Sequence, residues 1–281
     1  MDEIPEIVRS HDRNRYLAAL FMPEAKRPHV MALYAFSVEI SRIAGQVSEP
    51  QLAEIRLQWW LDALDGIYAG QPQAHPVAIA LAAAIKVGDL PKYALVNLAK
   101  AHQFDFYSDP MPGQTELEAY LGETHSALTK MAAMILDQDA ALQCSEACGL
   151  AGVAYGLAQT LNHLTRAREM QQCFLPQTWL AQHNLSPSDI YLPGNDAARS
   201  AVLAEMHALA EKRLAELGKV AWSIKPAVAA AFLHAVLAEP MLAGRKLMAR
   251  ASSPRAVKSA NYANNGCSGG RQNQNYSSVA L

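Results

Sequence analysis

Apolar residues recur along most of the chain at helical spacing, and no run of alternating β-branched residues bounded by turns occurs. Proline and glycine punctuate these segments, as at Pro23, Gly88 and Pro110. The pattern predicts helices over about 5–20, 27–43, 48–70, 75–87, 90–107, 115–136, 140–169, 196–222 and 226–250. The predicted fold class is therefore all-α. No repeat of fixed period is visible, so we expect a helical bundle and not a solenoid.

Local patterns refine the ends and faces of these helices. Ser48 with Gln51, and Thr115 with Glu118, have the spacing of a capping box, so Ser48 and Thr115 are expected to begin helices. In the helix after Ser48, we expect three apolar side chains to point inward, namely Ile55, Trp59 and Leu61.

Length and composition indicate one large domain with a polar tail. The chain has 281 residues, 51% of them hydrophobic, which is enough to bury a large core. From Ala251 onward Ser, Asn, Gln and Gly replace the apolar residues, so this part has little to bury. We predict a helical domain over 1–250 and a disordered tail over 251–281.

The balance of charge argues against nucleic acid as a partner. Lys and Arg number 24 against 26 for Asp and Glu, and a net charge of -2 attracts no polyanion. The acidic start of the chain, interrupted by Pro5, is unlike a signal or transit peptide. The longest apolar stretch, Pro226 to Ala238, is shorter than a membrane span and carries His234. We expect a cytoplasmic protein.

The spacing of the cysteines and the absence of common catalytic motifs restrict the kinds of site that the chain is expected to contain. The four cysteines form neither a CxxC pair nor a disulfide framework, which is typical of a reducing compartment. Cys144 and Cys148 lie one helical turn apart, so they are interpreted either as small core residues or as half of a metal site with His163 and Cys173. No GxSxG, P-loop, GxGxxG or HExxH motif occurs. His125 and His163 lie on apolar helices, where a hydrogen-bonded core role is commoner than a ligand or base.

Several landmarks occur in a characteristic order. They are Arg13-Asn14-Arg15-Tyr16-Leu17, the turn at Pro23, Tyr34-Ala35-Phe36-Ser37-Val38-Glu39, the stretch from Gly156 to Arg166, and Phe174-Leu175-Pro176. With these landmarks, about residues 10–245 resemble the squalene and phytoene synthase family of head-to-head prenyltransferases. The resemblance implies a single-domain, isoprenoid-synthase-like bundle of helices around a central apolar cavity.

The resemblance also implies a magnesium site that this sequence does not supply. In the family, one aspartate-rich cluster follows the Tyr-Ala-Phe-like stretch and a second precedes the Leu-Pro turn, and both hold magnesium against a prenyl diphosphate. Here no aspartate occurs from residue 13 to 61 or from 140 to 188. The acidic positions of the clusters fall instead at about Ser41, Arg42 and Gly45, and at Arg166 or Ala167 and Met170 or Gln171.

A few polar residues remain as candidates for the cavity. Asp105 stands where the synthases also tend to carry aspartate, whereas Asp109 precedes Pro110 and is expected outside the helix. A solvated helix end is the competing interpretation of both. Arg166 and Arg168 could bind an anionic group directly or face solvent. The candidate ligand-binding residues are Tyr34, Glu39, Asp105, His125, Gln159, Asn162, Arg166 and Arg168, and no catalytic residue or metal ligand is assigned.

Within the family, the details are most similar to the branch that includes an assembly factor for mitochondrial respiratory complex I, which also replaces the aspartates. This similarity is carried by Ala35-Phe36-Ser37-Val38-Glu39-Ile40, Val47-Ser48-Glu49-Pro50, Arg56-Leu57-Gln58-Trp59-Trp60, Leu117-Glu118-Ala119-Tyr120, Glu123-Thr124-His125-Ser126 and Leu164-Thr165-Arg166-Ala167. It implies a non-catalytic role.

Three hypotheses for function follow. The first is an accessory factor for the assembly of respiratory complex I, which has complex subunits or other assembly factors as partners, acts at the inner face of a membrane and uses no cofactor. The second is an active prenyltransferase that condenses farnesyl or geranylgeranyl diphosphate, with magnesium held by Asp105, Glu39 and Glu169. The third is a carrier that holds an isoprenoid or another lipid without reacting it.

Overall fold

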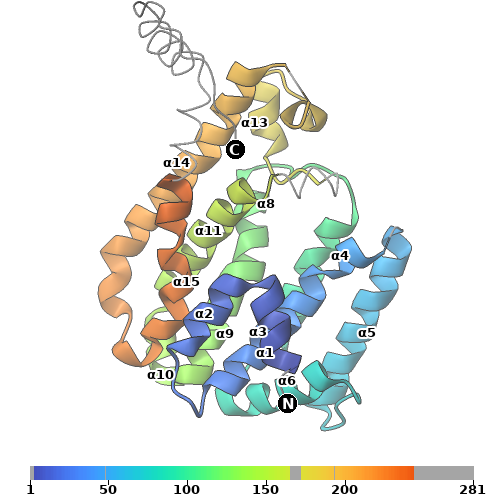
Figure 1. Ribbon diagram of the computed structural model, residues 1–281, viewed down its shortest axis with the longest axis vertical. Helices are drawn as coiled ribbons and strands as arrows, with labels where there is room; N and C mark the ends of the chain where they lie inside the picture. The colour runs from blue at the N-terminus through green and yellow to red at the C-terminus, as the bar shows by residue number, and fades with distance from the viewer. Residues whose placement is uncertain (1–2, 48, 165–171, 193, 244–281) are drawn as a thin grey trace, which may run out of the picture. The chain divides into compact units, whose positions relative to one another are not determined.

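The structure, a computed structural model, describes residues 3–47, 49–164, 172–192 and 194–243. These residues form helices joined by turns and contain no β-strand, which confirms the predicted all-α class. The chain divides into two units, Met1–Met241 and Leu242–Leu281, and the labelled helices belong to the first (Figure 1). The predicted polar tail, 251–281, lies outside the described residues.

Two long helices form the middle of the bundle. The helix α3 (Arg27–Ser41) buries nine of its residues, and α11 (Ser145–Asn162) buries eleven. Helices that are apolar on nearly every side must be surrounded by other helices. Accordingly, α3 packs against α1 (Glu3–His11), α6 (Pro76–Gly88) and α9 (Ala127–Leu136), and α11 packs against α9 and α14 (Asp196–Val220).

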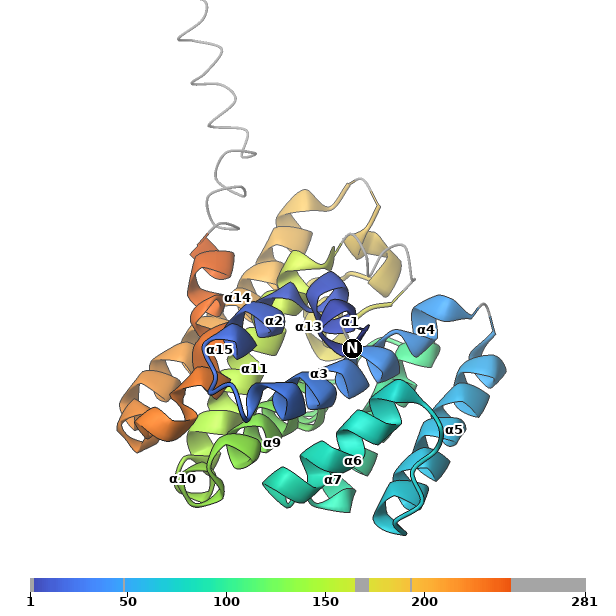
Figure 2. The same ribbon diagram turned by 60° about the horizontal axis from the view of Figure 1, so that its bottom comes forward.

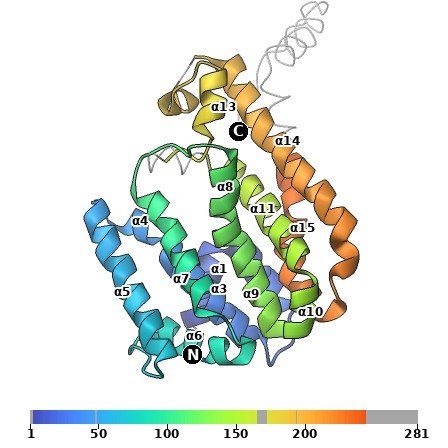
Figure 3. The ribbon, with the colours of Figure 1, turned by 180° about the vertical axis from the view of Figure 1, so that it is seen from behind.

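Shorter elements complete the two flanks of this core, as the view from behind shows (Figure 3). On one flank lie α4 (Ile43–Gln46), α5 (Pro50–Tyr68), α7 (Lys92–Ala101) and the 3-10 turn η1 (His102–Phe106). On the other flank the chain forms α13 (Gln177–Gln182), the 3-10 turns η3 (Pro187–Ile190) and η4 (Ala221–Ser223), and α14. The helix predicted over 196–222 is confirmed, whereas α4, α13 and η3 were not predicted.

The helix predicted over 5–20 is two helices, α1 and α2 (Arg13–Leu20), because the chain breaks at Asp12. The backbone of Asp12 leaves the helical region at φ -137° and ψ 69°, and its carboxylate accepts a hydrogen bond of 3.1 Å from the backbone N–H of Arg15. Asp12 therefore caps the start of α2. The break places residues 10–15 along one side of the main pocket.

The capping box predicted at Thr115 does not form. The helix α8 (Gln114–Leu121) begins before Thr115, and its N-cap residue, Gly113, has no side chain to accept a hydrogen bond. Glu49 is the N-cap of α5 and makes no side-chain cap hydrogen bond, while Ser48 lies outside the described residues. From α8 the chain continues through a π-helical turn, η2 (Gly122–Ser126), into α9. The prediction of one helical stretch to about Leu136 is thus confirmed, with a wide turn inside it.

The inward face predicted for α5 is wrong for Ile55 and Trp59, whereas Leu61 packs against the core as predicted. Ile55 is 67% exposed and Trp59 is 39% exposed, whereas Leu57 and Trp60 are buried. The helix carries two apolar stripes, and α5 lies at the outer edge of the bundle, where one stripe meets solvent (Figure 2). The spacing of apolar residues identified a helix but did not determine which stripe faces the core.

The helix predicted over 140–169 is interrupted at Cys144, whose φ of -110° and ψ of 26° separate α10 (Gln138–Gln143) from α11. Cys144 and Cys148 are both buried, with their sulfur atoms 4.0 Å apart. Among the described residues, no group of three or more His, Cys, Asp or Glu side chains is placed to hold a metal ion. Burial also raises the pKa of the Cys148 thiol, as expected of a core residue.

The segment predicted as a helix over 226–250 begins as a 3-10 helix, η5 (Pro226–Phe232), followed by α15 (Leu233–Val236) and a turn at Leu237. By length and composition alone, 226–243 would suffice to cross a membrane, so the prediction that this stretch is too short is wrong. His234 in the middle of the stretch is fully buried, and its Nε2 lies 3.2 Å from the hydroxyl of Thr129 on α9. The stretch therefore contributes to the core of the first unit.

Candidate functional site: a polar pocket between helices

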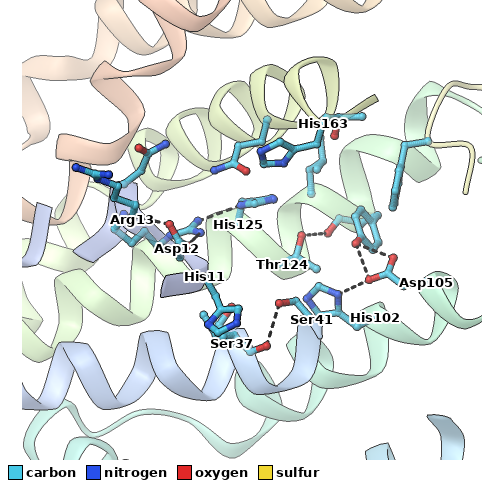
Figure 4. Close-up of a pocket in the computed structure, with 18 of the residues that line it drawn as sticks. His11, Asp12, Arg13, Ser37, Ser41, His102, Asp105, Thr124, His125 and His163 are labelled. Atoms are coloured by element: carbon cyan, nitrogen blue, oxygen red, sulfur yellow. Dashed lines mark hydrogen bonds and ion pairs between the residues drawn. The ribbon is translucent and has the colours of Figure 1, made fainter. Parts of the chain in front are cut away.

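A pocket of about 460 Å³ lies among α2, α3, η1, α8, η2 and α11 (Figure 4). Its size is within the range of small-molecule sites. The apolar side chains in its lining are those of Val38, Leu121, Phe174 and Met241, and the remaining lining residues are polar or charged. The lining is thus more polar than the central apolar cavity that the family resemblance implies.

The first wall of the pocket is built around Arg15, whose side chain is 4% exposed. One guanidinium nitrogen donates to Asp12 Oδ2 at 2.8 Å, and the other donates to His125 Nδ1 at 3.0 Å. A buried guanidinium requires a counter-ion, and Asp12 supplies it. Because Asp12 also caps α2, one carboxylate both starts the helix and neutralises its buried cation.

His125 is held in its neutral form. Its Nδ1 accepts a hydrogen bond from Arg15, so the proton of the neutral ring is on Nε2. Burial lowers the pKa of His125 well below 6.5, and the positive charge of Arg15 lowers this pKa further. His125 extends from the π-helical turn η2, and turns of this kind are frequent at functional sites.

Beneath this wall, Arg15 lies over two buried tyrosines. Its guanidinium carbon is 5.2 Å from the ring centre of Tyr155 and 5.9 Å from that of Tyr34. The Tyr155 hydroxyl accepts hydrogen bonds from the side-chain amides of Asn14, at 3.0 Å, and Gln159. Within the part of the chain that the structure describes, neither Arg15 Nε nor the Tyr34 hydroxyl has a hydrogen-bond partner, although both are buried. Such buried, unpaired polar atoms are costly and uncommon.

The second wall contains Asp105, at the end of η1. Asp105 Oδ2 is 2.6 Å from His102 Nδ1, and both side chains are 9% exposed. The Tyr120 hydroxyl donates to Asp105 at 2.9 Å from Oδ1 and 3.2 Å from Oδ2. Burial raises the pKa of Tyr120 well above 10, and the negative charge of Asp105 raises this pKa further. Tyr120 is therefore a neutral hydrogen-bond donor.

Residues after the undescribed segment 165–171 close this side of the pocket. The side-chain amide of Gln172 donates to the backbone carbonyl of Asp105, and the ring of Phe174 lies 5.5 Å from that of Tyr120. The backbone N–H of Met111 donates to the carbonyl of Cys173 at 3.0 Å. These contacts hold the predicted Phe174-Leu175-Pro176 landmark against η1 and α8.

The pocket does not fit a magnesium site of the kind that the family resemblance implies. Magnesium needs several oxygen ligands in nearly octahedral geometry. Of the positions expected to be acidic, Ser41 lines the pocket and donates its hydroxyl to the Val38 carbonyl, Arg42 is a cation, and Gly45 has no side chain. The second set, 166–171, lies outside the described residues. Asp12 and Asp105 line the pocket, but both are already bound by side chains of this chain.

The structure brings together some of the predicted site residues. Asp105, His125 and Gln159 line the pocket. Tyr34 is buried beneath Arg15, whereas Glu39 and Asn162 are absent from the lining, and Asn162 is exposed. Arg166 and Arg168 lie outside the described residues, as does Glu169. Asp109 is exposed and outside any helix, which confirms that part of the prediction.

Sequence reasoning missed four residues that shape the walls, namely Asp12, Arg15, His102 and Tyr120. Each carboxylate has a basic partner three positions away, Asp12 with Arg15 and Asp105 with His102, which is the spacing of neighbours on a helix. That spacing was readable in the sequence. The third member of each wall is not local, because His125 comes from 110 residues away and Tyr120 from a different helix.

Comparisons with known proteins agree with this architecture. A family model described as squalene/phytoene synthase matches residues 8–250. The NADH dehydrogenase (ubiquinone) complex I assembly factor 6 of Bos taurus is 29% identical over 238 residues, which cover 84% of this chain and 71% of that protein. The phytoene synthase of Rhodobacter capsulatus is 22% identical over 187 residues, covering 66% of this chain and 55% of that protein.

A solved structure supports the fold independently. The squalene synthase HpnC from Alicyclobacillus acidocaldarius superposes with a TM-score of 0.74 at 19% identity, covering 88% of this chain and 93% of that one. At this level of identity the likeness concerns the fold alone. Taken with the family model, which spans most of the sequence, it shows that the chain belongs to the squalene/phytoene synthase family.

Proposed function

We propose that this chain is a non-catalytic member of the family that acts by binding, as an accessory factor in the assembly of respiratory complex I. The observation that carries the proposal is the state of the pocket carboxylates. Asp12 is bound by Arg15, and both oxygens of Asp105 are engaged by His102 and Tyr120. A prenyl diphosphate needs metal-bound carboxylates to ionise, and no free pair lines the described pocket.

The named relatives support the role in assembly. The assembly factors of Bos taurus and Homo sapiens are 29% and 28% identical to this chain, each over 238 residues. Their partners would be subunits of complex I or other assembly factors. A cytoplasmic location, with contact at the inner face of a membrane, remains a prediction of the same hypothesis.

Gene deletion in the organism of origin tests the assembly role. We expect less assembled complex I on a native gel and lower NADH oxidation, with succinate oxidation unchanged as the control. The wild-type gene should restore both. Asp105→Asn should also restore them if its abundance on an immunoblot matches the wild type, because the role does not require a catalytic carboxylate. Unchanged complex I after deletion contradicts the proposal.

An active prenyltransferase is the second candidate, because Asp105 does lie in the pocket and synthases are among the relatives. Purified protein would be incubated with magnesium and farnesyl or geranylgeranyl diphosphate, and released diphosphate measured. We expect no turnover at enzymatic rates. Turnover that Asp105→Asn abolishes would instead establish the enzyme and overturn the non-catalytic proposal.

A further inference from the structure

We propose that the turn between α14 and η5 inserts into a lipid surface that carries anionic headgroups. This segment, residues 218–227, is called the α14–η5 turn below. The inference deepens the proposed function, which expects contact with a membrane, and it rests on that function for this expectation alone. It names the part of the chain that makes the contact and the lipid chemistry that this part recognises.

The first observation is an aromatic side chain that points away from the core. Trp222, in η4, is 80% exposed and is the most exposed large apolar side chain among the described residues. Tryptophan is covered for the most part in soluble domains. It is enriched at membrane–water interfaces, because its ring is apolar while its N–H can still donate a hydrogen bond. The α14–η5 turn lies at a corner of the first unit, where a flat lipid surface can reach it (Figure 1).

A second exposed aromatic side chain lies toward the same corner. Phe21, the C-cap residue of α2, is 77% exposed. The helix α2 packs against both η5 and α15. Arg13 at its start lines the pocket together with Met241, and the charge of Arg15 lowers the pKa of His234, so the two segments run antiparallel. The end of α2 at Phe21 is therefore directed toward the start of η5, where the α14–η5 turn ends.

The charges of the α14–η5 turn favour an anionic surface. Lys219 and Lys225 are both exposed, and they flank Trp222 at three residues on either side. No Asp or Glu occurs from residue 217 to 238. Lysine stems can lie along apolar surface while their ammonium groups reach outward. A membrane places anionic headgroups directly above its apolar layer, so one surface satisfies both the indole and the two lysines.

Carboxylates of adjoining segments do not cancel these two lysines. Glu216, just before the turn, is bound by Arg213 at 2.6 Å. Beside Phe21, the carboxylate of Glu24 is opposed by Lys26. On α10, which packs against η5, Asp139 is exposed. The two cations of the turn thus outnumber the exposed carboxylate of the adjoining helix.

The stretch after the turn determines the kind of membrane contact. By length and composition residues 226–243 would suffice to cross a membrane, but His234 within them is fully buried. Its ring lies 4.8 Å from that of Tyr155, so withdrawing this stretch would open the core. The contact is therefore peripheral. It is also separate from the pocket, because Arg13 of the pocket lining and Phe21 lie at opposite ends of α2.

Flotation of the full chain with lipid vesicles tests the proposal. One set of vesicles contains phosphatidylcholine alone, and the other contains equal parts of phosphatidylcholine and the anionic phosphatidylglycerol. We expect the chain to float with the anionic vesicles and to float far less with phosphatidylcholine, because the lysines need anionic headgroups. No flotation with either set, or equal flotation with both, overturns the proposal.

A tryptophan variant locates the contact. Trp222→Ala should weaken binding by at least about tenfold, since burying an indole removes on the order of 100 Å² of apolar surface from water. Tyr93→Ala is the matched control, because Tyr93 is 70% exposed but lies on α7, on the other flank. Circular dichroism would establish that both variants fold. Equal affinities of the two variants for anionic vesicles contradict the proposed contact.

A pair of lysine substitutions tests the recognition of charge. Lys219→Gln combined with Lys225→Gln should weaken binding about 25-fold, because each lysine near an anionic membrane contributes about a fivefold change in affinity. Lys86→Gln combined with Lys100→Gln is the control, since these exposed lysines on α6 and α7 change the net charge equally. Equal losses for the two pairs would show that net charge and not the α14–η5 turn governs binding.

Two further outcomes separate this inference from its alternatives. Light scattering that shows a dimer, which Trp222→Ala dissociates, would assign the turn to a second copy of the chain and overturn the lipid contact. Vesicles contain no complex I, so absence of flotation refutes the lipid contact and leaves the role in assembly standing. Unchanged complex I after gene deletion refutes the role in assembly even where vesicles bind.

Discussion

The two walls of the pocket neutralise their carboxylates by different means. On the first wall, Asp12 pairs with Arg15 at 2.8 Å, and Arg15 keeps its positive charge at any physiological pH. On the second wall, Asp105 lies 2.6 Å from His102 and accepts from the neutral Tyr120 hydroxyl at 2.9 Å. The first wall thus depends on a permanent ion pair, and the second on a shared hydrogen-bond network.

Because of this difference, removing one side chain should destabilise the two walls to different extents. Removing one member of a buried ion pair leaves the other charge without compensation, which is expensive in a low-dielectric interior. Removing one donor from Asp105 leaves its other donor in place, so the carboxylate stays partly satisfied. We therefore expect the Arg15 wall to be the more fragile, although the two walls contain similar numbers of polar groups.

The largest effect should come from Asp12→Asn. This change keeps an oxygen that can cap α2 but removes the counter-charge of Arg15, whose side chain is 4% exposed. We expect a loss of about 3 kcal/mol in the free energy of unfolding, at the low end for broken buried pairs because the Asp12 side chain is 17% exposed. Urea unfolding followed by circular dichroism measures this loss.

Two further variants test whether the loss of stability in Asp12→Asn comes from the broken ion pair. Asp65→Asn breaks the pair with Lys92, whose side chains are 67% and 46% exposed, and should cost at most about 0.5 kcal/mol. Adding Arg15→Met to Asp12→Asn should recover part of the loss, because no unpaired charge remains buried. Equal losses for Asp12→Asn and Asp65→Asn would show that the first wall does not depend on charge.

A smaller effect is expected on the second wall. Tyr120→Phe removes one donor to Asp105 and should cost about 1 to 2 kcal/mol. Tyr107→Phe is the matched control, since its hydroxyl donates to Glu54 at the surface, and it should change stability by less than about 0.5 kcal/mol. Thermal and urea unfolding would give both values. A cost for Tyr120→Phe that exceeds that of Asp12→Asn would reverse the order of the two walls.

Much of the fold was predictable because helices leave a strong local pattern. The apolar stripe of α3 and the all-round apolar surface of α11 gave both helices their approximate bounds. The break at Asp12 was not predicted, because a capping aspartate inside an amphipathic stretch looks like an ordinary polar position. The sequence predicts an inward position for Ile55, which is exposed, because both apolar stripes of α5 have helical spacing.

The candidate site was less predictable, since its contacts join distant parts of the chain. The sequence identified Asp105 and His125 as candidates but not that they belong to separate walls. The family resemblance implies carboxylates near Ser41, where the structure has a hydroxyl that donates to the Val38 carbonyl of its own helix. No pattern in the sequence predicts that Arg15 Nε is buried and unpaired, because this depends on the packing of several helices.

The smallest expected effect is on the stability of the protein in acid. It arises from a histidine of the first wall. Burial holds the pKa of His125 well below 6.5, so in the folded protein the ring stays neutral at pH values where it is already protonated in the unfolded chain. The unfolded state therefore binds more protons, and stability falls as the pH drops below 6.5. His234 has the same lowered pKa from burial and adds in the same direction.

Replacing His125 by glutamine should reduce this acid sensitivity and leave the His234 contribution. Glutamine keeps an oxygen that can accept from Arg15, but it binds no proton in this range. Below pH 6.5, the free energy of unfolding should fall less steeply with decreasing pH in the variant than in the wild type. We expect the two slopes to differ by on the order of 1 kcal/mol for each pH unit. Urea unfolding at pH values on either side of 6.5 measures the slopes for wild type and variant. Identical slopes would mean that protonation of His125 does not limit stability in acid. The first wall would then depend on the Asp12 charge alone.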